Sequence, residues 1–319
     1  MALFLNEREV AQLLPMDECI TALEESFKHA GSGSVEIKPR SRMRMPNGFF
    51  HFMAAADEAH QVFGYKAYPS FAGPDGSKFI VMLYDYESGK LLACMESGRL
   101  GQIRTGAASG LASKYMAKKE ASTVAIFGSG FQARTQLEAI CCACNIQKAK
   151  VYSRREERRN NFATQMSERL ELTVEAVDNP QECVSDADIV VTITSARDPV
   201  FEGKDLAPGC HVNAAGGNHW LRREIDEDTM KRSDLIVVDS LEQAKLECGD
   251  LLWLEARGSF RWNMVTELQD VVGGRIKARA SNDSITLFES MGIGLEDIAA
   301  AQLVYKKAIE QGVGVELPF

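Results

Sequence analysis

Apolar and polar residues alternate along this chain in two different rhythms, and each rhythm predicts its own kind of domain. Between residues 118 and 294, short runs of β-branched and apolar residues are separated by segments of helix length. This rhythm is typical of a parallel sheet covered by helices. The first four strands are expected at 123–127, 149–153, 172–176 and 188–194, and the fifth and sixth at 210–215 and 235–239. The pattern predicts an α/β fold with a doubly wound Rossmann domain over 118–294.

Residues 1–117 show a less regular pattern, which predicts a smaller α+β domain. Asn6 can cap a first helix, and a second helix begins near Pro15 and ends at the segment 31–34. Strand-like runs follow at 40–45, 49–53, 62–68, 79–84 and 91–95, and a helix of small residues at 101–116. We expect a last helix, 295–311, to return to this domain, so that 295–319 belongs with 1–117. The Rossmann domain is then inserted into the smaller one.

Composition and charge argue against several classes of partner. The chain of 319 residues has a formal net charge of −9 and no basic cluster with interleaved aromatic residues, which disfavours nucleic acid. No apolar window reaches the length of a membrane span, and residues 1–8 lack a signal-peptide pattern, so we expect no membrane contact and a cytoplasmic protein. Eight cysteines, among them Cys141, Cys142 and Cys144, are expected to be reduced thiols rather than metal ligands.

A glycine-rich turn follows the first strand of the predicted Rossmann domain. Gly128 lets the chain turn sharply, Gly130 leaves room for a pyrophosphate beside Ser129, and Ala133 lets the next helix pack closely on the strand. The N-terminus of that helix carries free N–H groups and a positive dipole end, both of which suit phosphates. A glycine turn that binds nothing is the alternative. The strands that follow favour dinucleotide binding.

The end of the second strand bears on the choice of cofactor. NAD-specific sites usually place an acidic residue there, but this strand ends in Ser153 and Arg154. A hydroxyl and a guanidinium can bind a 2′-phosphate, which predicts a preference for NADP(H) with NAD(H) still possible. Arg154 could instead be an ordinary surface residue. Thr192 and Ser195, at the end of the fourth strand, are placed near the nicotinamide, or they cap the next helix.

Six short motifs along the chain carry a family resemblance. They are 39–40, 64–66, 103–107, 128–130, 213–217 and 286–292. Taken together and in this order, they resemble the ornithine cyclodeaminase and mu-crystallin family over essentially the whole length. The resemblance implies a homodimer whose N- and C-terminal segments form a substrate-binding and dimerisation domain. It also places Ser290, within the last motif, in the cofactor site.

The resemblance further implies which residues bind an amino or imino acid. Arg40, Lys66 and Arg104 match the family residues that surround the substrate carboxylate and the reacting nitrogen, with Arg42 as a substitute for Arg40 and Thr105 beside Arg104. Their chemistry agrees, because arginine pairs bidentately with carboxylates and a desolvated lysine can transfer protons near neutral pH.

The surroundings of Lys66 decide how its amine behaves. We expect Tyr65, Tyr68 and Phe71 to surround the amine of Lys66 and shield it from water. The alternative is a lysine whose amine reaches solvent from the edge of a sheet.

Two departures from the family pattern point to the reaction. Where the cyclodeaminases carry a catalytic aspartate after paired glycines, this chain has Asn218, which cannot take a proton at neutral pH and is left to orient the substrate or cap a turn. His51 replaces a second carboxylate. We therefore predict an NADP(H)-dependent oxidoreductase that reduces a small α-imino acid or cyclic ketimine carboxylate to an amino acid, or the reverse. The alternatives are an ornithine cyclodeaminase and a non-catalytic binding protein.

Overall fold

The computed structural model describes residues 2–71 and 78–318 and divides the chain into two compact units. One unit contains the residues up to Arg104 together with those from Ile293 onward, and the other contains Thr105–Gly292. Each unit has its own sheet. The chain therefore leaves the first unit, builds the second and returns, which agrees with an inserted α/β domain.

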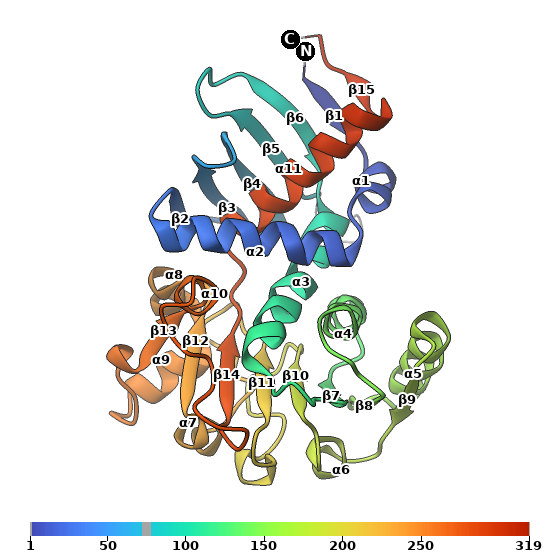
Figure 1. Cartoon of the computed structure of the whole chain (residues 1–319), viewed down its shortest axis with the longest axis vertical. Coiled ribbons are helices and arrows are strands. Elements are labelled where there is room, and N and C mark those ends of the chain that lie inside the picture. Colours follow the sequence, from blue (N-terminus) through green and yellow to red (C-terminus); the bar gives the residue numbers. More distant parts are fainter. Residues whose placement is uncertain (1, 72–77, 319) are drawn as a thin grey trace. The chain divides into compact units, whose positions relative to one another are not determined.

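The first unit is a seven-stranded sheet with helices on one face. Its elements are β1 (Leu3–Leu5), α1 (Glu7–Leu13), α2 (Met16–Ser32), β2 (Val35–Met45), β3 (Gly48–Asp57), β4 (Val62–Phe71), β5 (Ile80–Asp85), β6 (Leu91–Glu96), α11 (Gly294–Gln311) and β15 (Val315–Glu316). The strand order is β15-β1-β6-β5-β4-β3-β2, and only β1 and β6 pair in parallel. Helices α2 and α11 lie side by side across the sheet (Figure 1).

Local sequence explains where the first helices begin and end. The Asn6 side chain accepts hydrogen bonds from the backbone of Arg8 and Glu9, and the Glu9 side chain accepts one from the backbone N–H of Asn6, which forms a complete capping box for α1. Helix α2 ends at Gly33, whose φ of +85° is the left-handed conformation that glycine adopts without strain. The apolar residues of α2 at helical spacing, such as Leu23 and Phe27, are buried against the sheet as expected.

The second unit is an eight-stranded parallel sheet. Its elements are β7 (Thr123–Phe127), α4 (Phe131–Ala143), β8 (Lys148–Tyr152), α5 (Glu156–Leu170), β9 (Thr173–Ala176), α6 (Pro180–Val184), β10 (Ile189–Thr192), β11 (His211–Ala214), α7 (Glu227–Arg232), β12 (Leu235–Val238), α8 (Leu241–Glu247), α9 (Gly249–Glu255), β13 (Val265–Glu267), α10 (Leu268–Val272) and β14 (Thr286–Glu289). Alternate residues of β7 enter opposite cores: Val124 and Ile126 face one, and Ala125 and Phe127 the other. Helices cover both faces, as in a doubly wound fold (Figure 1).

One part of the predicted strand order is wrong. The order is β13-β12-β14-β11-β10-β7-β8-β9, so the late strand β14 occupies the sixth position and separates β12 from β11. All four residues of β14 are buried, which suits a strand with parallel neighbours on both sides. The apolar pattern of a short buried strand does not indicate which strands lie beside it. The segment 235–239 was expected sixth in the sheet, counted from β9, but it is the seventh strand.

Helix α3 (Gly98–Met116) contains the boundary between the two units, which lies after Arg104 rather than after residue 117. The second half of α3 packs within the dinucleotide-type unit. A Cβ on Gly106 would lie 2.3 Å from the carbonyl oxygen of Thr135, and Asn213 donates a hydrogen bond to Ser113 at 3.0 Å. The small residues of this helix thus allow the backbone of another segment to approach closely. From sequence alone, they could equally have made room for a ligand.

Two further expectations about the chain can be compared with the structure. No helix within residues 2–71 and 78–318 is both long and apolar enough to cross a membrane. None of the eight cysteines forms a disulfide.

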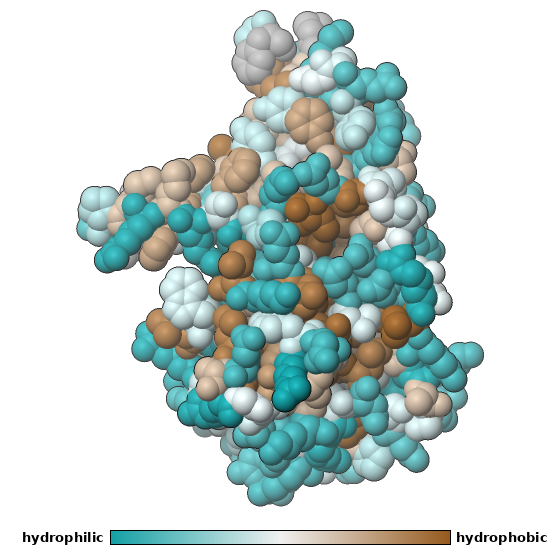
Figure 2. Space-filling view, turned by 90° about the vertical axis from the view of Figure 1, so that its left-hand side faces the viewer, coloured by the Kyte–Doolittle hydropathy of each residue, from teal (hydrophilic) through white to brown (hydrophobic). Residues whose placement is uncertain are grey.

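Figure 2 shows one face of the molecule, on which hydrophobic residues appear as small patches among hydrophilic ones. Exposed apolar side chains of the first unit include Met43, Phe71 and Ile80.

Candidate active site

Four charged residues meet inside the first unit. The Lys66 amine lies 3.0 Å from Oδ1 of Asp297, and the same oxygen accepts a hydrogen bond from Nε of Arg104 at 2.9 Å. Nη1 of Arg104 donates to Oε2 of Glu296 at 2.6 Å. All four side chains are buried. Asp297 therefore bridges the two cations, and the whole network is shielded from solvent.

The alternation of side chains along β4 explains which residues surround the Lys66 amine. Side chains alternate along β4, so Lys66 and Tyr68 project from one face. The rings of Tyr68 and Phe79 lie 5.7 and 5.6 Å from the Lys66 amine. The expectation for Tyr65 and Phe71 is wrong, because Tyr65 packs on the opposite face against the ring of Phe52 and Phe71 is exposed.

A glycine keeps space for the lysine amine. A Cβ on Gly101, in the first turn of α3, would lie 2.8 Å from the Lys66 amine. This separation is shorter than contacts that real Cβ atoms make, so any larger residue would displace the amine. Gly101 therefore belongs to the candidate site, although its sequence context suggested only a helix of small residues.

Burial and neighbouring charges shift the pKa values of this network. Desolvation by burial lowers the pKa of Lys66 to about 8, against the opposing effect of Asp297 and with help from Arg104 and Arg40. Burial acts to lower the pKa of Arg104 as well, but Asp297 and Glu296 outweigh it and hold that pKa above its usual range. Burial raises the pKa of Glu296 to about 6. Lys66 is thus the cation of the network whose proton is exchangeable near neutral pH.

The two arginines of β2 that could hold a carboxylate lie in different surroundings. The pairing of β2 with β3 is irregular between Lys38 and Ser41, and Arg40 sits within this irregularity with 6% of its surface exposed. Its charge contributes to the lowered pKa of Lys66. Arg42 is half-buried and lies opposite His51. Of the two, Arg40 is the one whose charge is felt at Lys66.

The cationic side chains of the network suit a substrate carboxylate. Lys66 and Arg104 are paired with Asp297 and Glu296, and Arg40 is buried close enough for its charge to lower the pKa of Lys66. Guanidinium groups pair well with carboxylates, so a site with two buried arginines beside a lysine favours an anionic ligand. Sequence reasoning missed both acidic residues, although adjacent acids in the apolar start of the last helix were a visible signal.

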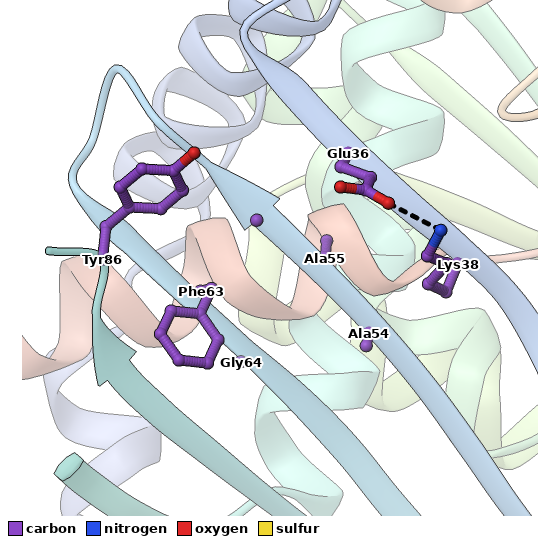
Figure 3. A pocket seen from close by; sticks show the side chains of 8 residues that line it. Glu36, Lys38, Ala54, Ala55, Phe63, Gly64 and Tyr86 are labelled. Atoms are coloured by element: carbon purple, nitrogen blue, oxygen red, sulfur yellow. Dashed lines mark ion pairs between the residues drawn. The ribbon is translucent and has the colours of Figure 1, made fainter. Parts of the chain in front are cut away.

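A separate groove lies on the other face of the same sheet. It is lined by Glu36, Lys38, Ala54, Ala55, Ala56, Phe63, Gly64 and Tyr86. Figure 3 shows the ring of Phe63 and the ion pair of Glu36 and Lys38 in front of the sheet, with α11 behind it. Because the lining contains neither Lys66 nor an arginine, this groove is distinct from the charged network.

In the second unit, the glycine-rich turn has the geometry of a phosphate-binding loop. Gly128 has a φ of +118°, and a Cβ there would lie 2.5 Å from the carbonyl oxygen of Ile193, so only glycine fits. Gly130 begins α4 without any side-chain cap, and its own Cβ position is open. Ser129 donates to Ser153 at 2.9 Å, which joins the turn to the end of β8. The uncapped N–H groups and the open space fit a pyrophosphate.

The remaining predicted cofactor residues fall into two groups. Arg154 and Ser195 are exposed, whereas Ala133, Thr192 and Ser290 are buried. The Ser290 hydroxyl, at the end of β14, has no hydrogen-bond partner within the described part of the chain. A buried hydroxyl without a partner is costly, so Ser290 fits a residue that contacts a bound molecule.

Thr192 has a partner that sequence reasoning did not foresee. Its hydroxyl donates to Oε2 of Glu224 at 3.0 Å, and the same carboxylate accepts from the hydroxyl of Thr194 and the backbone of Gly216. Glu224 thereby ties together the loops that follow β10 and β11. Burial raises its pKa. The hydroxyl of Thr192 is thus already engaged, and neither helix capping nor contact with a nicotinamide is needed to explain it.

Two predicted substrate residues belong to the second unit. Thr105 follows Arg104 in α3, and its carbonyl oxygen accepts a hydrogen bond from Gln136 at 3.1 Å. Asn218 is half-buried in the loop after β11. Position 218 therefore carries an amide, which cannot act as the base that the family pattern implies for cyclodeamination.

Comparison with known proteins places these features in a family. The model of the ornithine cyclodeaminase/mu-crystallin family matches residues 1–312. This chain belongs to that family. Within it, the chain is 39% identical over 241 residues to a Δ1-pyrroline-2-carboxylate reductase of Bacillus cereus, which covers 75% of this chain and 74% of the relative.

Solved structures of family members have the same fold. The Δ1-pyrroline-2-carboxylate reductase of Thermococcus litoralis, in complex with NADH and L-proline, superposes with a TM-score of 0.94 at 34% identity, covering 99% of this chain and 100% of that one. An archaeal alanine dehydrogenase dimer with bound NAD superposes with a TM-score of 0.93 at 31% identity, covering 100% and 99%. The expected family and fold class are therefore confirmed.

Proposed function

We propose that this protein is a nicotinamide-dinucleotide-dependent oxidoreductase that reduces a small α-imino acid or cyclic ketimine carboxylate to the amino acid, or catalyses the reverse oxidation. The buried network, in which Lys66 and Arg104 share Asp297 beside Arg40, is the observation that carries the proposal. The names of the relatives from Bacillus cereus and Thermococcus litoralis support it, and make Δ1-pyrroline-2-carboxylate the first substrate to test.

In this proposal the charged network binds the substrate and supplies a proton. Arg40 and Arg104 attract the carboxylate, and Glu296 and Asp297 fix the orientation of Arg104. Lys66, with a pKa of about 8, is protonated at neutral pH and can donate to the nitrogen as the α-carbon is reduced. The bound dinucleotide supplies the hydride for that carbon. Product formation thus consumes one reduced cofactor and one proton.

For the cofactor, we propose that the turn at Gly128–Gly130 and the uncapped start of α4 hold the pyrophosphate, with Ser153 and Arg154 beside the adenosine ribose. The preference for NADP(H) stays a prediction that depends on the missing carboxylate at the end of β8. The Thermococcus and archaeal relatives bind NADH and NAD. Measured kcat/KM for NADPH and NADH decides the question, and equal or better use of NADH would refute the preference.

The decisive experiment separates three activities in one assay. The purified chain is incubated with NADPH or NADH and Δ1-pyrroline-2-carboxylate, and absorbance of the reduced cofactor is followed together with the amino acid formed. We expect one proline for each cofactor oxidised. In parallel, ornithine is supplied with oxidised cofactor, and ammonia and proline are measured. Ammonia release without net cofactor change would establish a cyclodeaminase, and binding without turnover of any imine would establish a binding protein.

Asn218 provides a sharper comparison between reduction and deamination. Reduction of a preformed imine needs no carboxylate at this position, whereas a cyclodeaminase needs a base there, as the family pattern implies. We expect the unmodified chain to reduce the imine and to leave ornithine unchanged. Ornithine deamination that appears only in Asn218→Asp would support the assigned role, and efficient deamination by the unmodified chain would refute the assignment.

We also propose that the protein is a homodimer that buries the open face of the first unit's sheet. This face carries partly exposed aromatic residues such as Phe52 and Phe63 and the groove of Figure 3. The archaeal alanine dehydrogenase is a dimer. Analytical ultracentrifugation should give twice the mass of one chain, and Phe63→Asp should shift it towards the monomer. A monomeric unmodified chain would exclude this arrangement.

A further inference from the structure

Two histidines and two carboxylates gather in the first unit, at the end of α2 that carries its C-terminus. Nδ1 of His60 lies 2.8 Å from Oδ2 of Asp57, and Nδ1 of His29 lies 3.1 and 3.2 Å from the two oxygens of that carboxylate. Nε2 of His60 lies 3.5 Å from Oε2 of Glu25. Within residues 2–71 and 78–318, His29, Asp57 and His60 are the one trio of metal-ligating side chains whose ligand atoms converge within 4.8 Å.

The carboxylate of Asp57 lies between the two imidazole rings. Nδ1 of His60 and Nδ1 of His29 both face it, and Nε2 of His60 faces the carboxylate of Glu25. Imidazole nitrogen and carboxylate oxygen are common ligands of divalent transition metals. A cation bound at Asp57 could therefore be ligated by both rings.

The distances match a tetrahedral transition-metal site. Zinc binds nitrogen and carboxylate oxygen at about 2.0–2.2 Å, which places neighbouring ligand atoms roughly 3.3 Å apart. The separations of 2.8, 3.1 and 3.2 Å are within half an ångström of this value. Exposed fractions of 27% for His29 and 14% for His60, against 1% for Asp57, show that the two rings are partly accessible to solvent.

Surrounding hydrogen bonds already hold the ligands in place. Ser26 donates to Oδ2 of Asp57 at 3.0 Å, and the backbone N–H of His60 donates to Oδ1 at 3.1 Å. The carbonyl oxygen of His60 accepts from Gln302 of α11 at 3.0 Å. Such outer contacts orient metal ligands and raise affinity. The carboxylate of Glu25, 3.5 Å from Nε2 of His60, faces the ring nitrogen that points away from Asp57.

We propose that His29, Asp57 and His60 form a binding site for a divalent transition metal, with zinc as the best match, and that Glu25 orients His60. The ion joins the end of α2 to the turn between β3 and β4, so it stabilises the first unit. This site is separate from the network around Lys66. It is independent of the proposed reaction, and it can be tested without a substrate or a dinucleotide.

The first test uses the unmodified full chain after treatment with a chelator. Titration with ZnCl₂ in a calorimeter should show one ion bound per chain. The melting temperature should rise with zinc concentration. Cobalt(II) should give visible absorption typical of nitrogen and oxygen ligands, and zinc should displace it. A thiolate-to-cobalt charge-transfer band would assign the ion to cysteines and overturn the proposal.

The second test uses variants. His29→Gln and His60→Gln should each lower zinc affinity at least 10-fold, and Glu25→Gln by about 10-fold, as expected for an outer contact. His219→Gln, in the other unit, is the matched control and should leave affinity unchanged. Far-ultraviolet circular dichroism checks that the variants are folded. Unchanged zinc binding in the double variant His29→Gln/His60→Gln, or no binding by the unmodified chain, would overturn the proposal.

Discussion

Replacing Asp297 by asparagine tests whether Lys66 is the proton donor. In the present structure, burial lowers the pKa of Lys66 to about 8, and the negative charge of Asp297 at 3.0 Å prevents a larger decrease. Asp297→Asn keeps the shape of the side chain and removes that charge. The pKa of Lys66 should therefore fall below 8, so that the lysine loses its proton at a lower pH than in the unmodified protein.

The magnitude follows from the distance between the two charges. At an effective dielectric constant of about 20, unit charges 3.0 Å apart interact by roughly 5.5 kcal/mol, which is an upper bound. A remaining hydrogen bond from the charged amine to the asparagine oxygen returns about 1.5–3 kcal/mol. The difference, about 2.5–4 kcal/mol, corresponds to roughly 2–3 pH units at 1.36 kcal/mol per unit.

The assay is the pH dependence of kcat for imine reduction at saturating substrate and cofactor. Donation requires protonated Lys66, so the rate should fall as the pH rises through about 8 in the unmodified protein, and through about 5–6 in Asp297→Asn. Asp85→Asn, which changes an exposed turn of the same unit, is the control and should leave this limb in place. An unshifted limb in Asp297→Asn, in protein that binds substrate normally, would show that Lys66 is not the acid.

Three further predictions concern glycines and the ribose contact. Gly128→Ala should lower the melting temperature by roughly 5 °C and abolish dinucleotide binding, because the φ of +118° and a 2.5 Å contact exclude a side chain. Gly130→Ala should fold normally and lose only affinity for the dinucleotide. Calorimetry measures the melting temperatures, and fluorescence titration measures dinucleotide binding. Gly101→Ala should reduce kcat roughly 10- to 100-fold, since the new methyl group displaces the Lys66 amine. Arg154→Ala should raise the KM for NADPH about 10-fold and leave that for NADH unchanged in steady-state assays.

Local patterns in the sequence were sufficient for most of the elements. The expected helix at 295–311 corresponds to α11 (Gly294–Gln311), and the capping role of Asn6 is present in full. The glycine turn at Gly128 lies where the strand and helix patterns placed it. These features depend on residues within a few positions of one another, so a single chain contains the information needed to predict them.

Long-range pairings were not predictable in the same way. Lys66 and Asp297 are 231 positions apart, and no periodic pattern relates a lysine in a strand to an acid in a distant helix. The position of β14 between β11 and β12 has the same origin, because a fully buried strand is equally apolar beside any neighbour. The trio around Asp57 joins two segments, since His29 lies in α2 whereas Asp57 and His60 lie three residues apart at the end of β3 and in the turn that follows it, and no local pattern relates the two segments.

The acidic pair at the start of α11 connects stability with chemistry. Without Asp297 and Glu296, the first unit would bury Lys66 and Arg104 as uncompensated cations, a loss that typically costs about 3–5 kcal/mol. With the acids ionised and no burial, the charge of Asp297 would raise the pKa of Lys66 above its usual range, and the lysine would release protons poorly at neutral pH. Burial beside one shared carboxylate gives an intermediate result, in which the lysine is charged in the resting protein yet close to the pH at which it gives up its proton. We therefore expect substitutions at Asp297 to reduce stability and shift the pH profile together, whereas Tyr68→Phe, which keeps the ring beside the Lys66 amine, should not move the profile by a comparable amount.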